Sequence, residues 1–132
     1  MHIAESKNGY ENPWHVDTRR RIIHFLIYFG TDTIKEGGEL AIGKHTELNY
    51  LDYKQYPEIS NLERIEYIMP NDNTGVFILS QNNSYHKGCS LKGLRKFIYA
   101  GYTNKHGDAW KTKNWSDNVN FTQRLNQEKK SQ

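Results

Sequence analysis

The stretch Arg21-Ile22-Ile23-His24-Phe25-Leu26-Ile27-Tyr28-Phe29 decides the fold of this chain of 132 residues. It is almost continuously apolar and rich in aromatic and β-branched side chains, a pattern that predicts a strand buried on both faces. Four shorter segments of similar character follow, and residues that favour turns separate them: 39–42, 63–69, 76–79 and 95–102. Several short strands joined by such turns predict an all-β sandwich or barrel.

Turn-forming residues mark where these strands end. The loop from Gly30 to Gly38 finishes with a glycine pair, which frees the backbone before the second strand. Pro70 stops the third strand, and the run 71–75 tolerates positive φ, so we expect the fourth strand to return antiparallel. Residues 43–60 are polar and rich in tyrosine, and we interpret them as an excursion from the sheet.

Composition narrows the class of protein. The length predicts one domain with a single core. A lone cysteine, Cys89, rules out an internal disulfide and fits a reducing compartment. No apolar run approaches the roughly 20 residues of a membrane span, and the N-terminus lacks a signal-peptide pattern, so we expect a soluble cytoplasmic protein. The net charge is only +3, and we interpret the basic clusters 19–21 and 129–130 as a solvated turn and a frayed tail, which argues against nucleic-acid binding.

The C-terminal part of the chain differs from the rest. It is polar, and Trp110 and Trp115 are its large anchors. We therefore divide the chain into a β-rich core, residues 1–105, and a polar tail, residues 106–132. Ser116 is a residue of the type that caps helices, so a short helix is predicted from about Ser116 to Leu125.

A histidine and an aspartate two residues apart, His15-Val16-Asp17, stand just before the long apolar strand. Residues i and i+2 of an extended segment point the same way and lie about 6–7 Å apart, so both side chains can reach one metal ion. Two imidazoles and one carboxylate on one face of a mononuclear non-haem iron leave the opposite positions open. His86 is the candidate for the third ligand.

Arg95 opens the last predicted strand. If its side chain points into the sandwich, so do those of Phe97, Tyr99 and Gly101, because side chains alternate along a strand. Lys96 then faces away. A buried guanidinium without a partner is expensive, and a carboxylate fits its fork of donors, so the sequence predicts an anion-binding site at Arg95.

Four segments follow one another in an informative order. They are His15-Val16-Asp17; Leu26-Ile27-Tyr28-Phe29 with Gly37-Gly38-Glu39-Leu40; Gly75-Val76-Phe77-Ile78-Leu79 leading to His86; and Gly93-Leu94-Arg95. In this order, over residues 10–102, they resemble the catalytic core of the Fe(II)/2-oxoglutarate-dependent dioxygenases, nearest to the prolyl-4-hydroxylase-like branch. The resemblance implies a double-stranded β-helix, a cupin-like jelly roll with few or no N-terminal helices in this chain.

The resemblance also implies roles for individual residues. His15, Asp17 and His86 would be the catalytic Fe(II) ligands, and Arg95 with Tyr28 would bind the distal carboxylate of 2-oxoglutarate. Molecular oxygen and 2-oxoglutarate would be co-substrates, with vitamin C as an optional reductant. Decarboxylation of 2-oxoglutarate to succinate would then be coupled to oxidation of an unidentified substrate, a peptidyl proline or a small molecule.

Several other side chains are placed by strand alternation. We expect His24, Leu26, Phe97 and Tyr99 to line the cavity, because they share faces with Tyr28 and Arg95. His24 is a weaker candidate for a metal ligand, since it lies within the strand. The remaining histidines stand in polar segments and are expected to be solvated: His2, His45 and His106.

The chain departs from the family pattern at two places. Only fourteen residues precede His15, whereas the family usually carries N-terminal helices that cover the back of the larger sheet. We expect either a minimal or incomplete version, or an apolar face covered by a second copy or by the tail through Trp110 and Trp115. The Tyr-rich stretch 50–56 matches no family element and is interpreted as a substrate-side lid or an insertion.

The leading hypothesis is an oxygenase, most simply a hydroxylase, because Asp17 occupies a position that is a small residue in halogenating relatives. A second hypothesis is a cupin-like module without oxygenase activity that binds a metal or a small acid. A third is an inactive truncated fragment with a role in assembly. Dependence of succinate production on 2-oxoglutarate separates the first hypothesis from the second.

Overall fold

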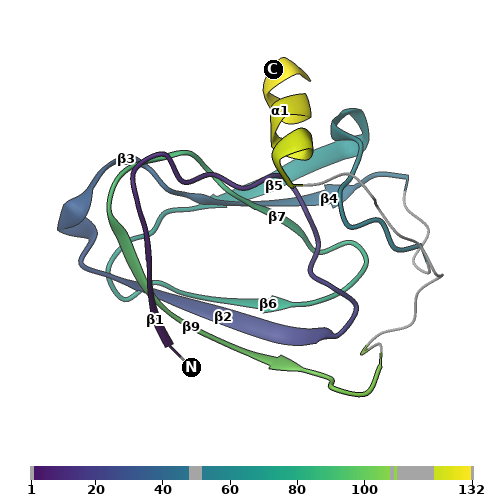
Figure 1. Cartoon of the computed structure of the whole chain (residues 1–132), viewed down its shortest axis with the longest axis horizontal. Helices are drawn as coiled ribbons and strands as arrows, with labels where there is room; N and C mark the ends of the chain where they lie inside the picture. Colours follow the sequence, from purple (N-terminus) through teal and green to yellow (C-terminus); the bar gives the residue numbers. More distant parts are fainter. Residues whose placement is uncertain (1, 48–51, 108, 110–120, 132) are drawn as a thin grey trace.

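The structure is a computed structural model that describes residues 2–47, 52–107, 109 and 121–131. Of the nine described strands, seven form two facing layers and two form a separate pair, and one helix lies outside them (Figure 1). The strands are β1 (His2–Ser6), β2 (Arg21–Phe29), β3 (Ile34–Gly37), β4 (Leu40–His45), β5 (Leu62–Ile68), β6 (Gly75–Leu79), β7 (Tyr85–Gly88), β8 (Leu91–Gly93) and β9 (Arg95–Thr103). Two 3-10 turns, Thr31–Thr33 and Ile59–Asn61, and the helix α1 (Phe121–Ser131) complete the described elements.

The two layers are antiparallel sheets. One layer has the strand order β1-β9-β2-β6, and the other has the order β5-β4-β7, with the β3-β8 pair as a separate two-stranded sheet. Strands that pair across this arrangement are often distant along the chain, as β2 is from β9. The prediction of an all-β jelly roll is confirmed.

The long strand β2 is central, as predicted, but it is not buried on both faces. Its burial alternates: His24 and Tyr28 are buried on the inner face, whereas Phe25 on the outer face is only half-buried. Phe25 packs against Phe77 of β6, whose side chain is 70% exposed. The prediction was wrong because the apolar residues of the outer face meet no second layer among the described residues.

Several elements differ from their predicted bounds. Residues 2–6, for which no strand was predicted, form β1, which pairs with β9. The loop 30–38 contains a 3-10 turn and β3, and the lead-in to the last strand contains β7 and β8, so His86 lies on a strand. These strands are short and polar, and pairing with a distant partner stabilises them where local sequence does not.

The hydrophobic core lies between the layers. One cluster combines Tyr28 from β2 with Leu40 from β4 and the inward residues Val76 and Ile78 of β6. A second cluster, of Val16, Tyr53 and Tyr85, packs at the edge where the chain enters β7. Tyr85 and Val16 are fully buried, so the residues next to His15 and His86 are anchored in the core.

The outer face of the four-stranded layer is apolar and open among the described residues. Its most exposed large side chains are Ile3, Phe77, Tyr102 and Leu79, at 72%, 70%, 69% and 56% exposure. Trp110 and Trp115, predicted as anchors that could cover this face, lie outside the described residues.

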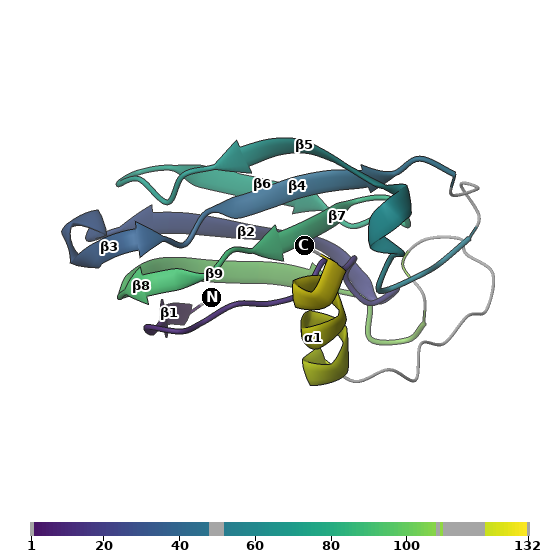
Figure 2. The ribbon, with the colours of Figure 1, turned by 90° about the horizontal axis from the view of Figure 1, so that it is seen from above.

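The helix α1 lies on the other side of the molecule, beside β7 and the segment that follows β1 (Figure 2). It runs to Ser131, beyond the predicted end at Leu125, while residues 116–120 of the predicted helix lie outside the described residues. Lys129, predicted to belong to a frayed tail, is on this helix and pairs with Glu11. No helix among the described residues is long and apolar enough to cross a membrane.

Candidate metal centre

Three side chains with metal-binding atoms meet at the inner edge of β7. The ligand atoms of His15, Asp17 and His86 all lie within 4.8 Å of one another. Backbone pairing sets the distance between the two histidines, because His15 N donates to His86 O at 3.0 Å and His86 N donates to His15 O at 2.9 Å. Their rings are 4.4 Å apart. One ion can therefore reach all three side chains.

The backbone also orients both rings. His15 Nδ1 lies 2.8 Å from Pro13 O, and His86 Nδ1 lies 3.0 Å from Ser84 O. Because a carbonyl oxygen only accepts, each Nδ1 carries the proton and each Nε2 is left with a free lone pair. This is the arrangement in which a histidine can bind a metal through Nε2.

Burial keeps both imidazoles neutral near pH 7. It lowers the pKa of His15, and it lowers the pKa of His86 to about 3, helped by the neighbouring His15. For Asp17, burial alone would raise the pKa, but contact with His24 and the electrostatic interaction with the neighbouring histidines lower it. The site thus offers two neutral imidazoles and one carboxylate, the protonation states that metal binding needs.

The two oxygens of Asp17 have different surroundings. Oδ2 lies 2.8 Å from His24 Nδ1 and accepts a hydrogen bond from Ser80 Oγ at 3.0 Å. The contact between His24 Nδ1 and Oδ2 does not meet hydrogen-bond geometry, so it is a close electrostatic contact. Oδ1 faces His86 Nε2 at 3.8 Å. His24 and Ser80 therefore occupy one oxygen and leave the other for a metal.

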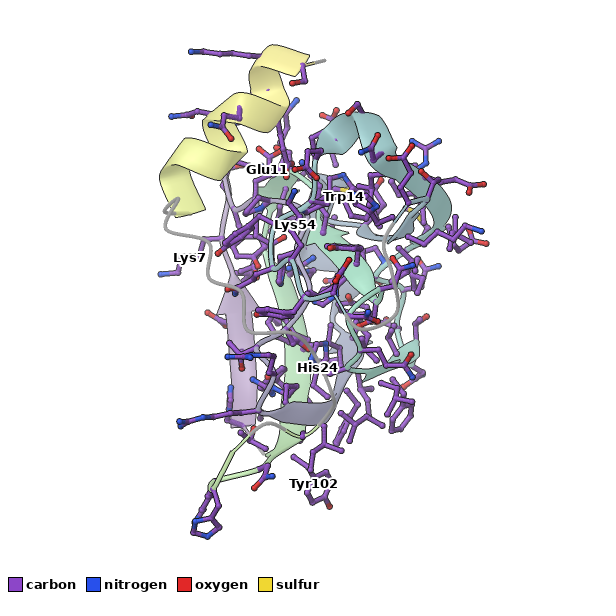
Figure 3. All side chains as sticks on the ribbon, turned by 90° about the vertical axis from the view of Figure 1, so that its right-hand side faces the viewer. Lys7, Glu11, Trp14, His24, Lys54 and Tyr102 are labelled. Atoms are coloured by element: carbon purple, nitrogen blue, oxygen red, sulfur yellow. The ribbon has the colours of Figure 1, made fainter. Side chains whose placement is uncertain are left out.

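A cavity of about 260 Å³ opens between the layers beside these ligands. His24, which supports Asp17, lies between the layers and away from α1 (Figure 3). The side chains expected to line the cavity do so: His24, Leu26, Tyr28, Arg95, Phe97 and Tyr99, with His15, Asp17 and His86. Lys96 is absent from this lining and lies opposite Glu5 of β1.

Arg95 and Tyr28 leave polar atoms unpaired in this cavity. Arg95 Nη1 donates to Gly38 O at 2.6 Å and Nη2 donates to Ser6 Oγ at 3.2 Å, which fixes the guanidinium. Arg95 Nε and the Tyr28 hydroxyl are buried without a partner. Burial raises the pKa of Tyr28, so its hydroxyl remains a donor. No described carboxylate pairs with Arg95, and buried donors of this kind fit a ligand carboxylate.

Some residues of the site were not predicted. Ser6 reaches Arg95 because β1 and β9 pair with these two residues opposite each other. Tyr10 and Asn12 line the cavity from the segment after β1. No local pattern marks them, since their position depends on pairing with the far end of the chain. His45, predicted to be solvated, is buried on β4, while His2 and His106 are exposed.

A second cavity, of about 280 Å³, contacts His15 and Asp17 from another side. Its other lining residues come from the segments around β2 and the Tyr-rich stretch: Asn12, Thr18, Arg21, Gln55 and Tyr56. Of the stretch 50–56, residues 50 and 51 lie outside the described residues. All three metal-binding side chains thus border the first cavity, which also contains the unpaired Arg95 and Tyr28, whereas only His15 and Asp17 border the second.

Comparison with known proteins adds one finding. Residues 1–104 match the family model of the 2OG-Fe(II) oxygenase superfamily. The match covers the two layers and every residue of the candidate site, and α1 lies beyond it. No curated protein matches the chain.

Proposed function

The chain belongs to the 2OG-Fe(II) oxygenase superfamily, and on this basis we propose that it is a hydroxylase that binds iron through His15, Asp17 and His86. The family gives the reaction class, an oxidoreductase that uses Fe(II), 2-oxoglutarate and molecular oxygen. The observation that carries the proposal is the meeting of three ligand atoms within 4.8 Å. Two imidazoles and one carboxylate are the donor set that non-haem iron prefers.

The unpaired donors of the first cavity support the proposal that 2-oxoglutarate binds there. Arg95 and Tyr28 would hold its distal carboxylate, because Nε and the hydroxyl are buried donors for which the described residues offer no acceptor. Gly38 and Ser6 hold the guanidinium in place for this contact. Bound iron would supply oxygen activation coupled to decarboxylation of 2-oxoglutarate to succinate. The protein supplies ligands, orientation and a shielded cavity.

The second cavity is a candidate binding site for the primary substrate. It borders His15 and Asp17, and its lining does not include Arg95 or Tyr28. We propose a substrate within the range used by the prolyl-4-hydroxylase-like branch, a peptidyl proline or a small molecule, with vitamin C as an optional reductant. Tyr56 lines this cavity, which supports a substrate-side role for the Tyr-rich stretch.

Anaerobic titration tests the proposed site. Addition of Fe(II) and then 2-oxoglutarate to the metal-free protein should produce the weak visible charge-transfer band of the chelate. Asp17→Ala should abolish the band, whereas Lys96→Ala, a change outside the cavity, should leave it unchanged. A 2-oxoglutarate-dependent release of succinate should accompany substrate oxidation. Absence of both the band and succinate in the wild-type protein would favour a binding module or an inactive fragment.

We also propose that the open outer face pairs with a second copy to form a homodimer. The large side chains exposed on it are apolar, and an exposed apolar patch of this kind favours association. Light scattering should give the mass of a dimer, and Phe77→Lys should give a monomer. Ile65→Lys is the matched control, because Ile65 is 58% exposed on β5 of the opposite layer. A monomeric wild-type protein contradicts this proposal.

Two further proposals concern organisation and location. We propose that residues 1–105 form the oxygenase core and that residues 106–132 are an addition to it, which agrees with a family match that ends at residue 104. A cytoplasmic location is proposed on the basis of the single cysteine, Cys89, which is unpaired.

A further inference from the structure

The helix α1 buries a carboxylate for which its sequence offers no local reason. Glu128 is only 5% exposed, whereas its neighbours Lys129 and Lys130 are exposed. It stands in the last turn of the helix, where the helix dipole disfavours a negative charge. Burial disfavours that charge as well. A carboxylate in this place requires compensating contacts.

Both oxygens of Glu128 are paired with the core. Oε1 accepts a hydrogen bond from Trp14 N at 2.6 Å, and Oε2 accepts one from Lys87 Nζ at 2.8 Å. Lys87 also lies 3.3 Å from Glu11 Oε1, and Lys129 lies 3.2 Å from Glu11 Oε2. Burial alone would lower the pKa of Lys87, but Glu128 and Glu11 outweigh it and raise that pKa. The four side chains form an ion-pair cluster between α1 and the core.

The two groups that Glu128 binds are each adjacent to a metal-binding histidine. Trp14 precedes His15, and Lys87 follows His86. Because the His15 N–H and C=O face β7, the N–H of Trp14 points to the opposite side, where no strand pairs with it. The Lys87 side chain lies on the face of β7 opposite to His86. Glu128 therefore accepts a hydrogen bond from the backbone N–H next to His15, and it pairs with the buried ammonium group of the lysine next to His86.

Other contacts also join these two segments, among them the backbone bridge between His15 and His86. Asn12 N donates to Gly88 O at 3.1 Å, and Gly88 N donates to the Asn12 side chain. Figure 3 shows Glu11 and Trp14 at the end of the molecule where α1 lies, in agreement with these contacts. One carboxylate of α1 thus spans the two segments that carry the histidines.

We propose that Glu128 is a positioning residue of the metal centre: it fixes the segments of His15 and His86 against each other and makes α1 part of the structure that supports the metal. The inference rests on the proposed metal site. It adds to that site an element that lies outside the family match. Groups that hydrogen-bond metal ligands directly typically change metal affinity 10- to 100-fold when they are removed, and because Glu128 acts through the residues next to the ligands, we expect a change at the lower end of this range.

The test is anaerobic titration of the full chain with Co(II), a spectroscopic substitute for Fe(II), followed by its visible d–d absorption bands. Glu128→Ala removes both contacts, whereas Glu128→Gln keeps an acceptor for Trp14 N and loses the charge that pairs with Lys87. Lys130→Ala is the matched control on the exposed side of α1. If Glu128→Ala does not fold, Lys87→Met breaks the same ion pair without changing the helix. Thermal unfolding of each metal-free variant is measured alongside.

We expect the dissociation constant for Co(II) to rise about tenfold in Glu128→Ala and by less in Glu128→Gln, with shifted d–d bands, and to stay at the wild-type value in Lys130→Ala. Wild-type affinity and bands in a folded Glu128→Ala or Lys87→Met, even with a lower melting temperature, would show that the cluster only stabilises the fold and overturn the inference. A wild-type protein that binds no Co(II) would instead overturn the proposed metal site itself.

Discussion

At the scale of single residues, the site separates metal binding from anion binding. Asp17 is the one anionic side chain among the three metal-binding groups, and the guanidinium of Arg95, at the same cavity, is held by Gly38 and Ser6 instead. The two functions depend on different side chains. They can therefore be removed one at a time.

Replacing Asp17 or Arg95 with Ala should give different losses. Asp17→Ala should reduce iron affinity and turnover together, because only two neutral imidazoles remain. Arg95→Ala should leave metal affinity nearly unchanged and weaken 2-oxoglutarate binding by about 2–5 kcal/mol, the usual loss when a buried charged partner is removed. Calorimetric titration of metal and of 2-oxoglutarate measures both effects. Normal 2-oxoglutarate affinity in Arg95→Ala would place the anion elsewhere.

His24 gives a second prediction at this scale. Its Nδ1 lies 2.8 Å from Asp17 Oδ2, and Ser80 binds the same oxygen. Among the described residues, His24→Ala leaves Ser80 as the side chain that contacts Asp17 Oδ2, so metal affinity should fall about tenfold, while Asp17→Ala should have the larger effect. The exposed His106→Ala serves as the control. Titration with Co(II) provides the measurement, and an unchanged dissociation constant in His24→Ala would show that Ser80 suffices.

At the scale of elements, the strands divide into those that local sequence predicts and those that pairing creates. β2, β5, β6 and β9 were predicted to within one residue at each end, because apolar runs and turn residues mark them directly. β1, β3, β7 and β8 were missed. Their sequences are short and polar, and a partner strand far along the chain holds each of them.

The same distinction applies to the candidate site. The His15-Val16-Asp17 motif is local, so its two side chains could be placed together from sequence. Ser6 and Glu128 could not be placed, because the register of β1 on β9 and the packing of α1 determine their positions. The outer face of β2 was wrongly predicted to be buried. Its residues are apolar, and an apolar sequence alone does not reveal whether a second layer covers that face.

The glycine turn between β3 and β4 gives a prediction about stability. Gly37 has φ of +75°, and a Cβ at this position would lie 1.9 Å from Ser90 O, a backbone atom that cannot move aside without disturbing β8. Gly37→Ala should therefore lower the free energy of unfolding by more than about 2 kcal/mol, from strain and steric overlap. Gly107→Ala should have little effect, because nothing lies within 4 Å of its added Cβ. Urea unfolding compares the two variants, and equal midpoints would contradict the prediction.

At the scale of the whole molecule, stability without metal should depend on pH through the buried histidines. His86 has its pKa lowered from 6.5 to about 3 in the folded protein, and the pKa of His15 is lowered too. Below pH 6.5 the unfolded chain takes up protons that the folded chain does not, so stability falls as the pH falls from 6.5 towards 3. The lowered pKa of Asp17 acts in the same direction below pH 3.8.

Thermal unfolding of the metal-free protein should show this dependence as a melting temperature that decreases from pH 7 to pH 4. His86→Asn removes one of the responsible groups and should give a shallower decrease, whereas the exposed His106→Asn should follow the wild type. A melting temperature that does not change over this range would contradict the assignment of neutral buried histidines.

The reciprocal backbone bridge between His15 and His86 also has a consequence for the order of folding. The two residues are separated by more than half of the chain, and they meet only when the segment before β2 has paired with β7. Contacts this distant along the sequence form late, because much of the chain must already be ordered to bring them together. Metal would then find no complete site in the unfolded chain or in early folding intermediates. Its binding should leave the rate of folding unchanged and lengthen the lifetime of the folded state, because interactions formed after the rate-limiting barrier act on unfolding alone.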